Sequence, residues 1–475
     1  MICVTGAERT TTALARRIAL HPEALHEVRI DHLETIDDDL FALVGRHATR
    51  VIACARARDQ GGQLAGDEAE RKRLLIRAAR AGAGYVDVEA DADDALLEAV
   101  GRRRVVLSWH DFDAIPDDVD ARVRAMVARD PAVVKVAFAV EDASDLVRLL
   151  TLRPTIPQRA VLIGMGTAGL LSRTHYARFG SGWTYVAATA ELATAPGQLD
   201  VATAHRHGLP ESATAPLCAL VGGPQVMRSP GARVYNALFR ELGLDWSYVP
   251  VVTRSLARVL PLLEALDARG LSVTMPLKAE AFARGEPDAL AARLGAVNSL
   301  SRHGDGWQAR NTDVVGVAAP LREALARASS AARRALVLGA GGAARAAVAA
   351  VEELGLEVVV AARRRERAEA IASRTQDWDA RTDADVDVLI NATSVVGEES
   401  PWPSEGPFPP LVFELALGAE SRLLADARAA GSATLDATAM WIHQGAAQMG
   451  WFLDRELAAS DLARHLAETS PRGTA

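Results

Sequence analysis

The stretch PAVVKVAFAV (131–140) places one lysine, Lys135, in the middle of a run that has the composition of a buried strand. An ammonium group in an apolar interior is costly unless it is paired or loses its proton. A desolvated lysine among arginines is shifted towards the neutral amine, which is a nucleophile for carbonyl carbons. The pattern therefore predicts a Schiff base at Lys135. The alternative is an ion-paired or snorkelling lysine with a structural role.

Other β-rich runs in the first half of the chain also end in polar residues or are followed by them. These residues are Glu27, Arg29, Arg56, Glu89, His110, Arg173 and Gln198. Arginines bind carboxylates through two parallel hydrogen bonds, so the expected substrate is an anion, most simply a carboxylate.

A second chemical pattern is the glycine-rich stretch GAGGAA (339–344), which lies between a β-rich run and a helical run. Glycines there let backbone N–H groups and a helix N-terminus approach a pyrophosphate. The next β-rich run, EVVVAARRRERA (357–368), ends in arginines, which suit a 2′-phosphate and favour NADP(H) over NAD. The alternative for the arginines is a solvated, basic helix start. The expected cofactor contacts of these two stretches are Gly339, Ala340, Gly341, Gly342, Ala343, Arg363 and Arg364.

The elements that must position these residues alternate between short β-rich runs and amphipathic helical runs, which is typical of repeated βα units. The first half of the chain contains eight such runs, which predict a (β/α)8 TIM barrel with its chemistry at the C-terminal ends of the strands. The runs are 2–6, 25–31, 50–56, 85–90, 104–112, 133–140, 159–166 and 182–188.

The polar stretch 205–216 is the best candidate for a linker, and the βα alternation restarts after it. The predicted fold is α/β throughout: a TIM barrel over 1–210, a substrate-binding domain over 216–318, and a Rossmann NADP domain over 319–440. The C-terminal helices, 441–467, are expected to complete the substrate-binding domain.

The composition narrows the class of protein. The chain has 475 residues, a formal net charge of −8 and no run of about 18 apolar residues, so neither nucleic acid nor a membrane is an expected partner. Three scattered cysteines fit a reducing, cytoplasmic setting. No cluster of His, Cys and Asp has metal-ligand spacing, so no metal is expected. The sequence makes no prediction of the oligomeric state.

The first half resembles the type I 3-dehydroquinate dehydratases through the motifs EVRIDH, RARDQGG, SWHDF, MGTAGLLSR and ATAPGQ, in that order and spacing. The resemblance implies that Lys135 forms the imine and that His110 is the general acid and base. It assigns the remaining substrate-site residues as Glu27, Arg29, Arg56, Gln60, Arg173, Thr194 and Gln198. One departure is Gln60, which stands where the family has a glutamate beside the catalytic histidine. Glutamine orients an imidazole but does not stabilise imidazolium by charge, unless Asp59 compensates.

The second half, from about Pro216, resembles the shikimate dehydrogenases through RSPGARVYNALF, LSVTMPLK, GAVNSL, RNTDVVGV, DVLINATSVVG and HQGAAQ. The resemblance implies that Lys278 and Asp313 shuttle a proton while NADPH supplies hydride. It adds the substrate contacts Ser229, Thr274, Asn298 and Gln444, and the cofactor contacts Asn391 and Thr393. This half departs from the family pattern at Met227, Ser272, Arg310 and Leu417.

Together the two resemblances predict a bifunctional enzyme. It would dehydrate 3-dehydroquinate to 3-dehydroshikimate and reduce that product to shikimate with NADPH, so its partners are small molecules. One rival is a quinate dehydrogenase-like or secondary-metabolism variant, suggested by Met227 and Leu417. Another is a non-catalytic metabolite sensor, suggested by Gln60, although Lys135, His110, Lys278 and Asp313 are all retained.

Overall fold

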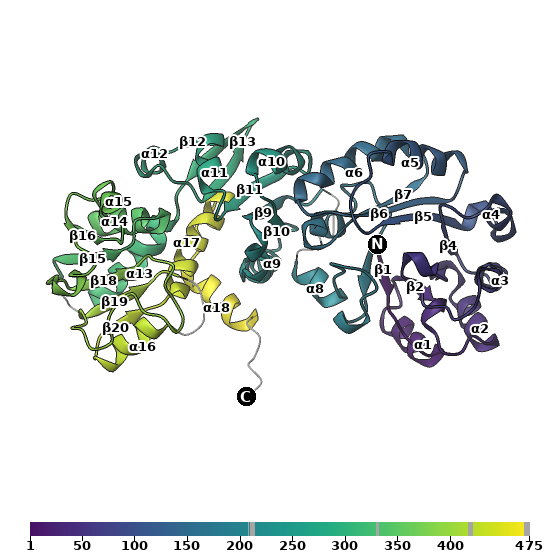
Figure 1. Cartoon of the computed structure of the whole chain (residues 1–475), viewed down its shortest axis with the longest axis horizontal. Coiled ribbons are helices and arrows are strands. Elements are labelled where there is room, and N and C mark those ends of the chain that lie inside the picture. Colours follow the sequence, from purple (N-terminus) through teal and green to yellow (C-terminus); the bar gives the residue numbers. More distant parts are fainter. Residues whose placement is uncertain (208, 210–213, 329–331, 417–420, 470–475) are drawn as a thin grey trace. The chain divides into compact units, whose positions relative to one another are not determined.

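The computed structural model describes residues 1–207, 209, 214–328, 332–416 and 421–469. The chain divides into two compact units, Met1–Ala268 and Arg269–Ala475, whose elements are labelled in Figure 1. The predicted domain limits stay predictions. Part of the predicted linker, residues 208 and 210–213, lies outside the described residues, as does Leu417.

The first unit is built on an eight-stranded sheet with the order β7-β6-β5-β4-β3-β2-β1-β8, in which neighbouring strands are parallel. The ring closes through a parallel bridge between Ala160 and Ser181, just before β8. The predicted eight-stranded α/β barrel is therefore confirmed. Its strands are β1 (Ile2–Thr5), β2 (Leu25–Arg29), β3 (Val51–Cys54), β4 (Tyr85–Glu89), β5 (Val105–Asp111), β6 (Val133–Ala139), β7 (Arg159–Met165) and β8 (Thr184–Ala187).

Helices follow the strands of the barrel in turn (Figure 1). Most of them begin at a residue that suits a helix N-terminus: Asp67 accepts a hydrogen bond from the Glu70 N–H, and Asp37, Asp93 and Asp200 make the same contact elsewhere. The helices are α1 (Thr11–Leu20), α2 (Asp38–Arg46), α3 (Glu68–Arg80), α4 (Asp94–Val100), α5 (Val119–Ala128), α6 (Val147–Leu152), α7 (Leu170–Thr174) and α8 (Val201–Arg206).

The inward-facing side chains of the barrel change from apolar to polar along each strand. Successive strand residues point to opposite faces, so every second residue faces the barrel interior. Apolar residues at the first inward positions pack into one core cluster, with Leu25, Ile52, Val106 and Val133 among them. The next inward positions on the same strands are Glu27, Cys54, Ser108 and Lys135, followed on three of these strands or just past them by Arg29, Arg56 and His110. This alternation collects the predicted site residues at the C-terminal end of the barrel.

The rest of the first unit is a parallel strand pair with its helices. Strand β9 (Leu217–Gly222) pairs along its whole length with β10 (Ser247–Val252). Between them lie the short helix η9 (Pro224–Arg228) and α9 (Gly231–Glu241), and α10 (Leu256–Ala265) follows β10.

The second unit begins with four strands in the order β11-β13-β14-β12, mostly antiparallel. These strands are β11 (Ala268–Val273), β12 (Glu286–Pro287), β13 (Ser299–His303) and β14 (Gly306–Arg310), and the helices among and after them are α11 (Lys278–Arg284), α12 (Ala289–Leu294) and α13 (Asp313–Arg327).

A six-stranded parallel sheet follows, with the order β17-β16-β15-β18-β19-β20. In chain order this is 3-2-1-4-5-6, the Rossmann order, so the predicted Rossmann domain is confirmed. The strands are β15 (Arg334–Leu338), β16 (Glu357–Ala361), β17 (Thr375–Gln376), β18 (Val388–Asn391), β19 (Leu411–Glu414) and β20 (Ala433–Leu435). The helices are α14 (Gly342–Glu353), α15 (Arg365–Glu369), α16 (Arg422–Ala429), α17 (Ala437–Phe452) and α18 (Ala459–Thr469). Among the described helices, none is long and apolar enough to cross a membrane.

Candidate active sites

Lys135 lies near the middle of β6 with only 4% of its surface exposed. Its ammonium is 2.9 Å from Asp87 Oδ2 and 3.8 Å from Glu27 Oε1, and it lies 4.4 Å from the centre of the Tyr185 ring. The structure adds two carboxylates to the arginines expected around Lys135, and these carboxylates compensate its charge. The polar face of Tyr185 adds a cation–π contact.

Asp87 contacts two other polar side chains besides Lys135. It also accepts a hydrogen bond of 2.6 Å from Ser108 Oγ and pairs at 3.0 Å with Arg56. Burial alone would raise the pKa of Asp87, but the positive charges of Arg56 and Lys135 outweigh burial and hold that pKa far below its ordinary value. Asp87 is thus an ionised carboxylate near neutral pH.

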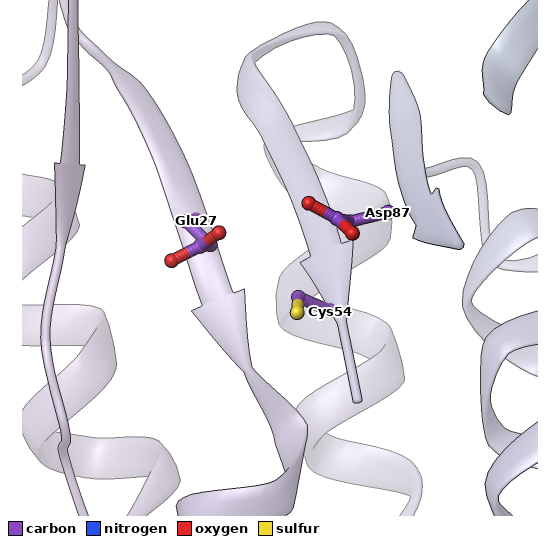
Figure 2. Close-up of side chains that lie close together, drawn as sticks. All are labelled: Glu27, Cys54 and Asp87. Carbon is purple, nitrogen blue, oxygen red and sulfur yellow. The ribbon is translucent and has the colours of Figure 1, made fainter. Parts of the chain in front are cut away.

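Figure 2 shows Asp87 with Glu27 and Cys54, which project from β2, β3 and β4 and lie close together. Their potential ligand atoms lie within 4.8 Å of one another, the spacing of a possible metal site. Both carboxylates already have protein partners, since Glu27 accepts a 2.7 Å hydrogen bond from Thr5 and Asp87 pairs with two cations. Burial raises the pKa of the Cys54 thiol well above its ordinary value, which keeps it protonated. The cluster therefore fits a charge-compensating network around Lys135.

His110 is the last inward-facing residue of β5, and the Gln60 side chain contacts its ring. Its Nδ1 lies 3.2 Å from Gln60 Oε1, and its ring stacks on Phe112 with 6.2 Å between centres. Burial, followed by the charges of Arg56 and Lys135, lowers the pKa of His110 well below 6.5. The imidazole is therefore neutral near pH 7 and available as a base. Asp59 is exposed.

One cavity of about 130 Å³ collects these groups. All nine side chains that the sequence predicted for this site line it: Glu27, Arg29, Arg56, Gln60, His110, Lys135, Arg173, Thr194 and Gln198. The loop after β8 is shaped by Gln198, whose Oε1 accepts hydrogen bonds from the Thr194 N–H and hydroxyl. The structure thus brings the predicted residues together, while their roles in a reaction stay predictions.

The three arginines of this cavity differ in their partners. Arg29 makes two hydrogen bonds to Asp31, of 2.9 and 2.7 Å, and Arg56 pairs with Asp87. Arg173 is equally buried, but no carboxylate pairs with it in the part of the chain that the structure describes. Its Nη2 donates to the Pro196 carbonyl at 3.4 Å, whereas its Nε has no hydrogen-bond partner there, and burial lowers the pKa of Arg173 to about 10. An anion entering the cavity would supply the missing partner.

In the second unit, Lys278 and Asp313 form a pair at 2.7 Å between Nζ and Oδ2. Lys278 is the first residue of α11, and Asp313 is the first residue of α13. The N–H groups at the N-terminus of α13 favour the negative charge of the Asp313 carboxylate. Asn298 donates to Asp313 Oδ1 at 2.7 Å and to Thr312 Oγ1 at 3.0 Å, which fixes the carboxylate. The Thr312 hydroxyl in turn lies 3.3 Å from Gln444 Oε1.

Thr274 and Ser229 are two further residues that the resemblance predicts as substrate contacts. Thr274 follows β11 and is half-buried, and its carbonyl accepts a hydrogen bond from the Leu277 N–H. Ser229 belongs to the first unit, where its Oγ accepts a hydrogen bond from the Gly231 N–H.

The glycine-rich turn follows β15, at the point where the Rossmann sheet changes direction between β15 and β18. Gly339 has φ of +111°, and a Cβ there would lie 2.9 Å from the Ala392 carbonyl oxygen, so only glycine fits. Gly341 precedes α14 without a side-chain cap, which leaves the first N–H groups of the helix for an anion. Arg363 and Arg364 are exposed past the end of β16. These features fit a dinucleotide with a 2′-phosphate.

Asn391 ends β18 and is fully buried. Its side chain donates to Glu414 Oε2 at 2.8 Å and accepts from the Thr393 N–H at 3.0 Å. Asn391 therefore shapes the loop that carries Thr393, and its own amide is already occupied.

Comparison with known proteins finds a matching enzyme family for each half of the chain. The family model of type I 3-dehydroquinase matches residues 2–207, and the model of the shikimate dehydrogenase substrate-binding domain matches residues 221–300. The shikimate dehydrogenase (NADP(+)) of Natronomonas pharaonis is 38% identical over 239 residues, which are 48% of this chain and 89% of that protein. The chain belongs to the shikimate dehydrogenase family.

Other relatives extend this assignment. The bifunctional 3-dehydroquinate dehydratase/shikimate dehydrogenase of Arabidopsis thaliana, a chloroplastic protein, is 29% identical over 470 residues, or 90% of this chain and 77% of that protein. A crystal structure of a shikimate dehydrogenase with NADP+ matches with a TM-score of 0.50 and 26% identity, covering 55% of this chain and 98% of that one. The resemblance of the chain to both families is thus confirmed.

The second unit also contains a buried polar residue, Gln448, that sequence reasoning missed. Gln448, 1% exposed, donates at 2.6 Å to Ser299 Oγ and contacts the hydroxyl of Ser272. Ser272 is one of the departures from the family pattern, and the structure gives it a buried partner. Gln448 lies one helical turn beyond Gln444 on α17, so helical spacing was the available clue.

Proposed function

We propose that the chain catalyses two consecutive steps: the barrel dehydrates 3-dehydroquinate to 3-dehydroshikimate, and the second site reduces this product to shikimate with NADPH. The observation that carries the first step is the meeting of Lys135, His110 and Arg173 around one cavity, where Arg173 has no carboxylate partner among the described residues. Arg173 binds the substrate carboxylate, which leaves the ketone facing Lys135.

Dehydration begins when Lys135 transfers a proton to His110 and its nitrogen attacks the ketone carbon. The oxygen of the resulting carbinolamine then leaves as water, taking one proton from the nitrogen and the other back from His110. His110, neutral at pH 7, removes the proton next to the resulting iminium. The enamine expels the hydroxyl group two carbons from the iminium, and His110 returns the proton so that water leaves. Hydrolysis of the imine frees Lys135. Asp87 and Glu27 stabilise the cationic states of the nitrogen.

In the reductase, NADPH supplies hydride to the ketone carbon when it is bound. The fit of the Gly339 turn, the α14 N-terminus and the arginines after β16 supports this cofactor. Lys278 donates a proton to the developing alkoxide, and Asp313 holds the ammonium in place for that transfer. Asn298 keeps the Asp313 carboxylate in position.

The test uses the whole purified chain. Borohydride added with 3-dehydroquinate should leave a reduced adduct on the peptide that contains Lys135, and shikimate with NADP+ should produce NADPH absorbance. Lys135→Ala should abolish the first result and keep the second, while Lys278→Ala should do the reverse. Absence of both activities in the wild-type chain would favour a metabolite sensor.

Met227 supports a second candidate, a reductase with changed substrate preference. It stands at the position where the resemblance expects a serine hydroxyl for the substrate carboxylate, and its thioether offers no strong hydrogen bond. Turnover on shikimate and quinate under the same conditions separates the two candidates, and a clear preference for shikimate excludes the second.

We also propose that residues 1–210, 216–318 with 441–467, and 319–440 are the three functional domains. Cys3 and Cys54 are buried thiols that form no disulfide among the described residues, which supports a cytoplasmic place of action.

A further inference from the structure

Strand β10 belongs to the sequence region that matches the reductase, yet its two ends are anchored to the dehydratase barrel. At the end of β10 the anchor is Asp142, which lies in the loop after β6 and is 5% exposed. Its Oδ1 accepts hydrogen bonds from Thr253 Oγ1 at 2.8 Å and from the Ser144 N–H at 2.9 Å. Its Oδ2 accepts one from the Arg254 N–H at 2.8 Å.

Asp142 thus meets three donors, two of which come from the segment that follows β10. Burial alone would raise the pKa of Asp142, but these hydrogen bonds, led by that of Arg254, hold it below its ordinary value. The surrounding ion pairs, Glu141–Arg254 at 3.6 Å and Asp145–Arg258 at 3.2 Å, are more exposed and so contribute little. The buried carboxylate is therefore the main polar contact at this point.

At the start of β10 the anchor is His175, which follows α7 of the barrel and is 2% exposed. Its Nε2 lies 2.7 Å from Ser247 Oγ, and its Nδ1 lies 3.0 Å from Thr174 Oγ1. Burial, followed by the charge of Arg178, lowers the pKa of His175 to about 3, so the ring is neutral. Arg178 adds hydrogen bonds to the Leu266 and Ala215 carbonyls, of 2.6 and 2.8 Å.

The contacts of Asp142 and His175 fix strand β10, which supports the segment that carries Ser229. Strand β10 pairs with β9 along its length, and β9 leads through η9 to Ser229 and α9. Helix α9 is fixed to β10 by Asn236, which accepts from the Tyr248 N–H at 2.7 Å and donates to the Tyr248 carbonyl at 2.9 Å. The Tyr235 and Tyr248 rings pack at 4.7 Å. Movement of β10 would therefore move Ser229.

We propose that Asp142 and His175 are positioning residues for the reductase: they dock β10 on the dehydratase barrel, so that the barrel holds in place the segment of Ser229, a predicted substrate contact of the reductase. This inference rests on the proposed function. Neither residue lines the dehydratase cavity, so loss of the docking should change the reductase and spare the dehydratase.

The experiment measures both activities in Asp142→Ala, with Asp145→Asn as the matched control, since Asp145 is a nearby acid whose partner Arg258 is exposed. We expect the KM for shikimate to rise about tenfold or more in Asp142→Ala, because a buried charged hydrogen-bond group is lost. The kcat of the dehydratase and the KM for NADP+ should stay within about twofold, and the control should match the wild type.

Several outcomes are decisive. Equal losses in both activities, or a shikimate KM like that of the control, would overturn the docking role. If Asp142→Ala does not fold, Thr253→Val and Ser247→Ala remove one hydroxyl each from the reductase side, and an unchanged shikimate KM in both would overturn it equally. Absence of shikimate oxidation in the wild-type chain would instead refute the proposed function.

Discussion

Replacing Gln60 by glutamate places a negative charge beside the imidazole of His110. The side chain has the same length, and Gln60 Oε1 already lies 3.2 Å from His110 Nδ1, so the contact should survive the change. The substitution therefore alters the charge at a fixed position. His110 now has a pKa well below 6.5, because it is buried near Arg56 and Lys135.

The size of the effect follows from Coulomb's law. A unit charge about 3.2 Å away attracts an imidazolium by about 5 kcal/mol at an effective dielectric constant of about 20. Burial of the new carboxylate and its attraction to Arg56 and Lys135 offset much of this. A net rise of about 1 to 3 units in the pKa of His110 is the ordinary range for a carboxylate at this distance.

The assay is the pH dependence of dehydratase kcat, followed through the absorbance of 3-dehydroshikimate. His110 acts as a base only when neutral, so raising its pKa should move the acid limb of the profile to higher pH by about 1 to 3 units. Asp59→Asn is the control, because Asp59 is exposed and its loss should leave the limb in place. An unmoved limb in Gln60→Glu would refute the role of Gln60 as the neutral partner of His110.

Three further changes test other parts of the two sites. Asp87→Asn leaves Arg56 and Lys135 without a shared counter-charge and should lower the free energy of unfolding by about 3 kcal/mol or more, as measured by urea denaturation; an unchanged midpoint and slope would contradict the network. Lys278→Ala should lower reductase kcat by about 10² to 10⁴ and keep dehydratase kcat, and equal losses in both would argue against its role as acid. Arg363→Ser should raise the KM for NADPH about tenfold and leave that for NADH unchanged, whereas equal changes for both cofactors would exclude a 2′-phosphate contact.

The sequence predicted the strands of the barrel and the position of its site because period-two patterns specify which side chains share a face. Glu27, Lys135 and His110 follow apolar inward residues at this period, so their convergence could be expected. Asp87 follows the same rule in YVDVEA, two residues before Glu89, so the period predicts its inward position but not its charged partners.

The charge balance around Lys135 could not be predicted, because it depends on distances across the barrel. Asp87 reaches both Arg56 and Lys135 from a third strand, which no local pattern reports. Long-range pairs such as Asp142 with Thr253 are separated by 111 residues and arise only when β10 packs against the barrel. The same holds for Gln448, whose buried partners lie on strands far away in the chain.

The most direct test of two consecutive activities in one chain is a single incubation of the purified protein with 3-dehydroquinate and NADPH, followed by mass spectrometry of the products over time. We expect 3-dehydroshikimate to appear first and shikimate to follow with equal consumption of NADPH. Lys135→Ala should stop the series at the start, and Lys278→Ala should stop it at 3-dehydroshikimate. Unchanged 3-dehydroquinate in the wild-type reaction would contradict the proposed pair of activities.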